Sequence, residues 1–336
     1  MGKQLVNHTR ADSSVVNQDG QQITFTVPRQ FDVERYSLIF RGAFNVTTIG
    51  AGLTTNQLWG YIRRIELIAS GQTVIRSFTG FECAAIEAYF QKYDIVNSVA
   101  CRSNPNNVVG SQAFSMVLPL SLALPDMVRP KDSNLRAEAL ASLELRITFG
   151  NITDVLGAGA VGTINANMLV QVANVLELAN SDEKRSAPMY ITKITQIDVS
   201  TAAANANFLQ RLPVGNTLRA IFLTPKQNGL PYSPTVAQPA LNTFIVQRGT
   251  DNRINLTMAE MLYNYAKEAK LAPAQLPFVG VYDFMLRGQG SGQGKITEGF
   301  RVDGAMDLNG LFDFPALANG VLTMTIVEYI EMRRTK

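Results

Sequence analysis

Two stretches of the chain repeat one order of elements, and this repetition limits the folds open to the sequence. Residues Ile62–Asp94 predict a strand, a turn at Ser70-Gly71, a second strand and then a helix. Residues Asn242–Leu271 predict the same succession, with the turn at Arg248-Gly249. A strand-turn-strand that leads into a helix twice in one chain indicates an internal duplication.

The two predicted helices begin with the same capping signal. Thr79 lies three residues before Glu82, which is the spacing of a capping box. Thr257 lies three residues before Glu260 in the same way. In such a box the Thr hydroxyl accepts a hydrogen bond from an early helix amide, and the Glu carboxylate accepts one from the Thr amide. The two threonines are as far apart in the chain as the two glutamates, so the two signals align without a gap.

Each half also ends in a long apolar strand, predicted at Ala166–Leu178 and at Val321–Met332. In both, apolar residues recur at every second position and so lie on one face of the strand. A glutamate on the other face lies one residue before the end. These glutamates, Glu177 and Glu331, are closer together in the chain than the two capping threonines are, so the second copy is 24 residues shorter between its helix and its last strand. We expect the extra residues of the first copy in the range Gln91–Ser142.

The pattern as a whole predicts an all-β fold. Each half holds about eight strand candidates with a single helix among them, and the clearest strand alternates from Ser142 to Phe149. The strands are not separated by regular helices, which excludes a parallel doubly wound sheet and favours antiparallel sandwiches or barrels. We therefore predict two tandem eight-stranded antiparallel jelly rolls, each with one inserted α-helix.

The domain boundaries follow from polar and charged segments. The densest charge cluster, ANSDEKRSAP, ends in a proline and marks the predicted linker. The predicted organisation is an N-terminal arm (residues 1–20), a first jelly roll (21–178), a linker (179–187), a second jelly roll (188–333) and a tail (334–336).

Composition favours a protein that assembles. Charged residues make up 17% of the chain, below the usual quarter, so contacts or uncharged polar side chains must cover much of the surface. The formal net charge of +3 is too small to argue for nucleic-acid binding, and we expect no specific nucleic-acid recognition. Because the N-terminus is polar, we expect no signal peptide, and no run of 18 apolar residues predicts a membrane span.

The residues that usually carry catalysis are scarce, and we expect no enzyme. His8 is the only histidine, which argues against a catalytic triad or a His/Cys zinc site. The cysteines, Cys83 and Cys101, are more simply explained as small apolar residues than as a disulfide. Carboxylate pairs remain open, but three aspartates near the end (Asp303, Asp307 and Asp313) are better explained as turn residues. We assign no catalytic, cofactor-binding or metal-binding residue.

Basic residues gather at both ends of the chain. They are Lys3, Arg10, Arg333, Arg334 and Lys336. They are either solvated tails or contacts to the phosphates of lipid or nucleic acid, and the sequence leaves both open.

The chain resembles the double jelly-roll major capsid proteins of tailless, membrane-containing icosahedral bacteriophages, in the adenovirus-like capsid lineage. The residues that carry the resemblance are the duplicated stretch IRRIELIASGQTVIRSF and its second copy at Phe244–Leu271. The resemblance covers roughly residues 20–333 and rests on architecture and duplication. It implies homotrimers whose six jelly rolls form a pseudo-hexagonal capsomer, assembled in the host cytoplasm into the shell of a virion. It also implies neighbouring capsomers and other capsid proteins as partners, no cofactor, and basic termini that approach the lipid headgroups of an internal membrane.

Two other classes of protein fit an all-β chain. A carbohydrate-binding or glycan-hydrolysing jelly-roll protein would need clustered aromatic side chains or a close carboxylate pair, and Trp59 is the only tryptophan. A viral spike would show a coiled-coil or fibrous stem, and the sequence shows none.

Overall fold

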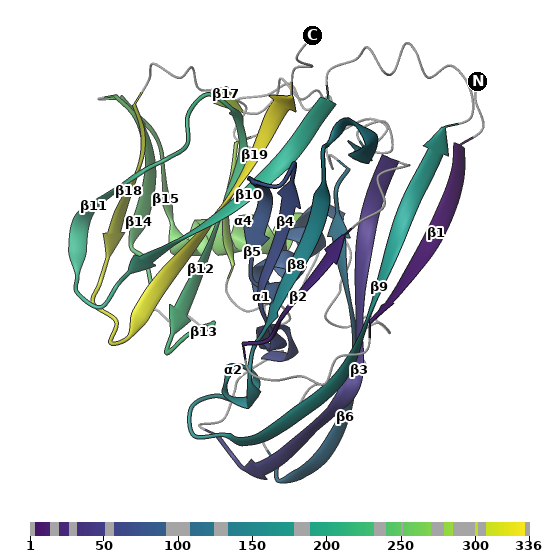
Figure 1. Ribbon diagram of the computed structural model, residues 1–336. Helices are drawn as coiled ribbons and strands as arrows, with labels where there is room; N and C mark the ends of the chain where they lie inside the picture. The colour runs from purple at the N-terminus through teal and green to yellow at the C-terminus, as the bar shows by residue number, and fades with distance from the viewer. Residues whose placement is uncertain are drawn as a thin grey trace. The chain divides into compact units, whose positions relative to one another are not determined.

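The computed structural model describes most of the chain (Figure 1). The described residues are 4–13, 20–26, 32–50, 57–91, 108–123, 134–177, 189–231, 240–249, 251–269, 279–284, 300–301 and 307–332. They form two compact units. The first unit comprises Met1–Lys193 with Ile330–Lys336, and the second comprises Ile194–Tyr329. The predicted linker, residues 179–187, lies outside the described residues, and the predicted domain boundaries stay predictions.

The first unit is built from two antiparallel sheets. One sheet has the strand order β1-β9-β3-β6, with the short β7 beside β3, and the other has the order β5-β4-β8-β2. The strands are β1 (Gln4–Ser13), β2 (Gln22–Thr26), β3 (Asp32–Thr48), β4 (Ile62–Ala69), β5 (Thr73–Phe78), β6 (Gly110–Ser121), β7 (Leu135–Arg136), β8 (Leu143–Phe149) and β9 (Val161–Glu177). The helices are the 3-10 helices η1 (Gln57–Tyr61) and η3 (Ala137–Ala139), and the α-helices α1 (Gly80–Gln91) and α2 (Ile152–Leu156).

The second unit is built in the same way. One sheet has the order β10-β19-β12, with β13, β16 and β17 on the other side of β12, and the second has the order β11-β18-β14-β15. The strands are β10 (Met189–Ser200), β11 (Asn205–Arg211), β12 (Thr217–Gln227), β13 (Leu230–Pro231), β14 (Thr243–Arg248), β15 (Asp251–Thr257), β16 (Gly280–Asp283), β17 (Phe300–Arg301), β18 (Leu308–Phe314) and β19 (Gly320–Met332). The helix is α4 (Met258–Ala269). From Ile194 onwards β10 belongs to this unit, as β19 does up to Tyr329.

The two units share one strand order. Within the described residues, each unit has eight strands of at least four residues. Numbered along the chain within each unit, these strands form sheets of order 1-8-3-6 and 2-7-4-5 in both. In both units the long helix follows the fifth strand. This is jelly-roll topology, which leaves few free strand edges. The predicted fold class, two tandem eight-stranded jelly rolls with an inserted helix, is therefore confirmed, and the five-residue α2 is an addition to it.

The first strand of the first unit lies in the segment that the sequence analysis interpreted as an arm. Residues 4–13 form β1, which pairs with β9 from Gln4 opposite Glu177 to Ser13 opposite Met168. The segment lacks apolar alternation, so periodicity alone could not predict it. A strand at the edge of a sheet can be held by backbone hydrogen bonds to one neighbour, which polar residues make as well as apolar ones.

The core of the first unit lies between its two sheets. Along β8 the burial alternates at every residue, as its sequence predicts. Phe149 at the end of β8 packs edge-on against Phe40 of β3, with 5.9 Å between ring centroids. Tyr61 of η1 contacts both Phe40 and Phe149 at 5.8 and 5.2 Å. These rings are almost completely buried and join both sheets to η1.

Gly42 in β3 is required for close strand packing and not for a bend or bulge. The pairing of β3 with β6 and β9 runs through Gly42 without a register shift. A Cβ at this position would collide with the carbonyl oxygen of Asn165 and with Ala166 on β9. Glycine is therefore required because two backbones approach closely there.

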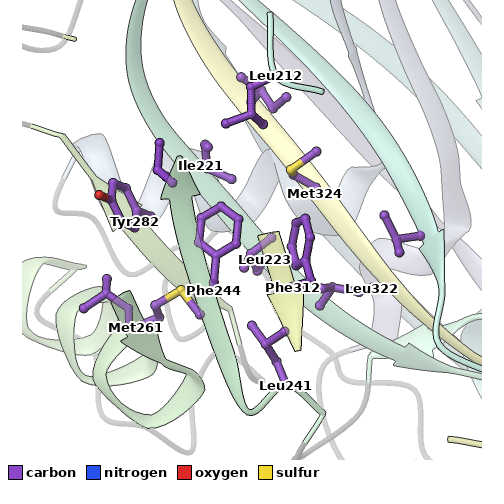
Figure 2. Close-up of a cluster of buried hydrophobic side chains, with 14 of the residues drawn as sticks. Leu212, Ile221, Leu223, Leu241, Phe244, Met261, Tyr282, Phe312, Leu322 and Met324 are labelled. Carbon is purple, nitrogen blue, oxygen red and sulfur yellow. The ribbon is translucent and has the colours of Figure 1, made fainter. Parts of the chain in front are cut away.

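The core of the second unit is also aromatic and aliphatic. Figure 2 shows Phe244 of β14 between Tyr282 of β16 and Phe312 of β18. The ring centroids of Phe244 and Tyr282 are 5.6 Å apart, and those of Phe244 and Phe312 are 4.8 Å apart. Met261, on the first turns of α4, is buried in the same cluster and ties the helix to it.

The two copies differ in length at two places. The helices α1 and α4 correspond end to end, and so do the strands β8 and β18, but the connection from helix to strand is longer in the first copy. The segment that contains Gln91–Ser142 holds 13 of the 24 extra residues, which confirms part of the expectation. The other 11 lie after β8, about six of them in the connection to β9, which contains α2, and the rest in β9 itself.

Candidate assembly surfaces

The outer face of the sheet β5-β4-β8-β2 carries charges that pair with one another. Glu66 on β4 lies directly opposite Arg146 on β8, and Arg146 lies opposite Thr24 on β2. We call these three residues the charged row. The Glu66 carboxylate also accepts from Arg64, with 3.0 Å between Oε1 and Nε, while Arg146 lies 3.8 Å from its other oxygen. Partly exposed ion pairs of this kind add little stability but keep a sheet face compatible with water.

The equivalent face of the second unit carries aliphatic side chains instead. Leu209 on β11 lies opposite Leu311 on β18, and Leu311 lies opposite Ile245 on β14. We call these three residues the aliphatic row. Leu209 is 51% exposed, and the other two are partly buried. The row faces away from the core, because its residues alternate with buried residues along β14 and β18.

Polar residues flank the aliphatic row on both sides. On one side Gln247 lies opposite Asn309, and on the other Thr243 lies opposite Asp313. An apolar centre with a polar rim is the usual anatomy of a protein–protein interface. This sheet face can therefore bury its centre against another protein while its rim stays hydrated.

A second group of exposed apolar residues lies at the strand ends of the first unit. It consists of Ile49, Val108, Val109 and Val161, which are 51%, 53%, 66% and 55% exposed. We call it the strand-end cluster. Val161 begins β9 and pairs with Thr48, the last residue of β3, while β6 begins beside the same end of β3. The pairing thus gathers four aliphatic residues at one end of one sheet, which is unusual for a surface that stays in water.

The two capped helices confirm the predicted signals to different degrees. At α4 the box is complete, since the Thr257 amide donates to Glu260 Oε2 (2.8 Å) and the Glu260 amide donates to Thr257 Oγ1 (3.3 Å). At α1 the Glu82 amide donates to Thr79 Oγ1 at 3.4 Å. Both helices thus begin where their sequences predict.

The buried polar groups of α1 serve the fold. The Glu87 carboxylate accepts from the Ser121 amide (2.8 Å) and hydroxyl (2.7 Å), which anchors α1 to the end of β6. Burial raises the pKa of Glu87, while the hydrogen bonds from Ser121 and the charge of Arg76 oppose the shift. Burial, and then the nearby Glu87, raise the pKa of the Cys83 thiol well above its usual value, so this cysteine is an inert apolar residue rather than a nucleophile.

A buried ion pair joins two strands of the second unit. Arg219 on β12 donates to Asp283 on β16, and both side chains are almost fully buried. Nearby along the same sheet, Asn216 Nδ2 donates to Glu328 Oε1 at 2.8 Å. Because a lone buried charge is costly, these contacts fix the strands in place.

The structure does not bring the predicted basic residues together. Lys3, Arg333, Arg334 and Lys336 lie outside the described residues, and Arg10 lies in β1 opposite Gln171. Their proposed role stays a prediction. Cys101 and Asp303 also lie outside the described residues. Asp307 forms an exposed ion pair with Arg211, and Asp313 accepts from Asn242, with 3.5 and 3.1 Å between the atoms.

Two other kinds of site are absent from the part of the chain that the structure describes. No three or more His, Cys, Asp or Glu side chains there are placed to hold a metal ion. No helix in those residues has the length and apolar character needed to cross a membrane.

Solved structures of viral capsid proteins share the fold over nearly the whole chain. The major capsid protein of STIV, the Sulfolobus turreted icosahedral virus, matches with a TM-score of 0.72 and 14% identity, over 97% of each chain. The major capsid protein P2 of bacteriophage PM2 matches with a TM-score of 0.58 and 12% identity, over 99% of each chain. The PBCV-1 virus capsid matches with a TM-score of 0.59 and 14% identity, over 98% of this chain and 94% of that one.

No protein-family model matches the sequence. No curated protein matches it either. At these identities the structures show a common fold, that of the double jelly-roll capsid proteins. These fold neighbours are structural proteins and not enzymes.

Proposed function

We propose that this chain is a major capsid protein of a tailless icosahedral virus. The observation that carries the proposal is the tandem pair of jelly rolls with identical strand order, matched over 97% of the chain by the STIV capsid protein. The chain would form homotrimers with six jelly rolls each, and these pseudo-hexagonal capsomers would tile the shell of the virion. Other capsomers and capsid proteins would be its partners.

The exposed surfaces support assembly as the mechanism. The aliphatic row and the strand-end cluster leave seven apolar side chains partly or largely open to water in one copy. Moving a fully exposed Val, Leu or Ile into a dry interface contributes about 1.5–3 kcal/mol, and covering these partly exposed side chains contributes the corresponding part of that. Contacts with further copies would cover these residues, and the low content of charged residues is compatible with wide, wet contacts.

The finer details of the proposal come from the resemblance in sequence. We infer that the virus is a bacteriophage with an internal membrane and that the shell assembles in the host cytoplasm. The basic termini, Lys3 and Arg10 at one end and Arg333, Arg334 and Lys336 at the other, would then approach anionic lipid headgroups.

The proposal is tested by purifying the expressed protein and measuring its mass by sedimentation, followed by negative-stain imaging. Trimers that appear as pseudo-hexagonal rings or closed particles are the expected result. A monomer at micromolar concentration that forms no particle would contradict the proposal. Binding on a glycan array by such a monomer would favour the carbohydrate-binding alternative.

A further inference from the structure

The fifth strands of the two units, β5 and β15, are equivalent but differ in their neighbours. Each pairs with the fourth strand of its unit, β4 or β14. The first unit includes the start of β10, Met189–Lys193, and β10 is hydrogen-bonded to β5 on the side away from β4. The strand β15 is the last of its sheet, so within the described residues its outer edge has no partner.

The open edge of β15 has the same pairing pattern behind it as the paired edge of β5. The register of β4 with β5 skips Ile75, and the register of β14 with β15 skips Arg253. Both residues lie four positions before the capping threonine of the helix that follows, so the two bulges are equivalent. Because a bulge bends and twists its strand, β5 and β15 present their outer edges in the same way.

The first strand of the first unit supplies a matching open edge. The strands β1 and β10 are the first of their units, and each pairs on one side with the last strand of its unit, β9 or β19. On its other side β10 is hydrogen-bonded to β5. The strand β1 ends its sheet, so in the described part of the chain that other side is open. One copy therefore offers one open edge of a fifth strand and one open edge of a first strand.

We propose that β15 of one copy pairs with β1 of a second copy. A fifth strand already pairs with a first strand inside each chain, so the contact between copies repeats a pairing that this sequence forms. Such a contact joins two different surfaces of identical copies, head to tail, and closes into a ring when its rotation permits. This inference rests on the proposed function and names the strands through which the copies of a capsomer join.

The two edges are suited to pairing through their backbones. An added strand is held mainly by main-chain hydrogen bonds, so the polar sequence of β1 is no obstacle. Its backbone already forms a continuous ladder with β9 over all 10 residues. At the end of β15, Asn255 and Thr257 are exposed, so another chain can reach this edge.

Neither strand carries the residues that usually protect an open edge. Edge strands that stay in water are often blocked by proline or lysine. The sequences of β1 and β15, QLVNHTRADS and DNRINLT, contain neither residue. A long unprotected edge is a template for another strand, and the proposed pairing covers both edges at once.

The first experiment identifies the partner of β15 by cross-linking in the full chain. The photo-reactive p-benzoylphenylalanine replaces Asn255, and protein labelled with ¹⁵N is mixed with unlabelled protein before assembly and irradiation. We expect peptides that join β15 of one isotope to residues 4–13 of the other. The matched control places the same group at Thr73, an exposed residue of β5. Its cross-links should stay within one isotope, because β5 has its partner in the same chain.

The second experiment measures the pairing without any substitution. Hydrogen exchange of the wild type is compared between assembled particles and copies that dilution has separated. We expect some β15 amides to exchange roughly tenfold more slowly or less in the particles, because they gain hydrogen-bond acceptors there. The amides of β5 should exchange at the same rate in both samples.

The outcomes separate the inference from the proposed function. If the wild type assembles while the β15 amides gain no protection, the inference is wrong and the capsid proposal stands. Cross-links from β15 to a segment other than β1 also overturn the inference, because another strand or loop then covers the edge. If the wild type stays monomeric and forms no particle, the capsid proposal fails and the inference fails with it.

Discussion

The charged row of the first unit and the aliphatic row of the second occupy equivalent places in corresponding sheets of the two units. In both units, residues on the second, seventh and fourth strands lie opposite one another and face away from the core. Glu66 and Arg146 in the first unit thus correspond to Ile245 and Leu311 in the second. The first pair is compatible with water, whereas the second is stabilised by being covered.

This difference separates the strand positions that must stay apolar in both units from those that can differ between them. The side of each strand that faces the core stays apolar in both units, as β8 and β18 show by their identical alternation of buried and partly buried residues. The outward side has no such requirement within one copy. We therefore expect the chemistry of the outward side to depend on what each unit contacts outside its own jelly roll.

The largest expected effect comes from two adjacent residues on opposite sides of β18. Phe312→Ala removes a ring from the core of the second unit and should destabilise it by about 3–5 kcal/mol. Leu311→Ala, on the outward side and only partly buried, should cost clearly less, about 1 kcal/mol. Denaturant unfolding measures both, and equal losses from the two substitutions would mean that the outward side is part of the core.

An exchange of the two rows should alter assembly more than folding. Leu311→Arg combined with Ile245→Glu installs the charges of the first unit, which can pair in water but are costly to bury. We expect a folded protomer whose yield of particles is reduced roughly tenfold or more. The matched variant, Arg146→Leu with Glu66→Ile, should gain non-specific association because it exposes a new apolar patch. Normal particle yield from the first variant would show that the aliphatic row stays exposed.

Loss of a capping box should lower the stability of its unit by less than the core substitution does. Thr257→Ala removes the hydroxyl that accepts from the Glu260 amide in the complete box at α4 and should destabilise the second unit by about 1 kcal/mol. Thr257→Ser keeps the hydroxyl and is the matched control. Thermal melting would show the loss, and an unchanged melting temperature for Thr257→Ala would mean that the box contributes nothing measurable.

The smallest predicted effect is a pH dependence confined to the first unit. The pKa of Glu87 is raised by burial, so the folded state keeps a proton that the unfolded chain releases at lower pH. The stability of the first unit should therefore decrease as the pH rises from the usual pKa of a glutamate through this raised pKa. In α4 the position equivalent to Glu87 is occupied by Tyr265, which has no carboxyl group.

Hydrogen exchange of the α1 and α4 amides, measured across this pH range, tests the prediction. Glu87→Gln removes the charge but keeps an oxygen that can accept from Ser121, so it should abolish the dependence at α1. A pH dependence of α1 that persists in Glu87→Gln would assign it to another group.

Features set by neighbours along the chain were predictable from the sequence, and features set by distant residues were not. Thr79 and Thr257 cap their helices as predicted because a capping box spans only four residues. The strand β1 was not predicted, since only its pairing with β9 makes a strand of polar residues. The close approach at Gly42 depends on β9 in the same way.

The candidate surfaces required the structure for a similar reason. Leu209, Ile245 and Leu311 are visible in the sequence, but they form a row only through the register of three strands. The only signal in the sequence is one apolar residue in each strand at a position where the alternation predicts a side chain that faces away from the core. Likewise, the exposure of Tyr263 and the burial of Ala85 follow from tertiary contacts rather than from the helices themselves.

The pairing of β1 with β9 also determines when the first unit can finish folding during synthesis. Its first strand has no partner until its last strand, residues 161–177, has left the ribosome, and the closure of such a long loop makes folding slow. The second unit has the same arrangement, with β10 beside β19. The first jelly roll can therefore close while the second is still being made, whereas the second waits for β19. A chain that stops before residue 320 would leave the edge of β10 open to pair with other chains.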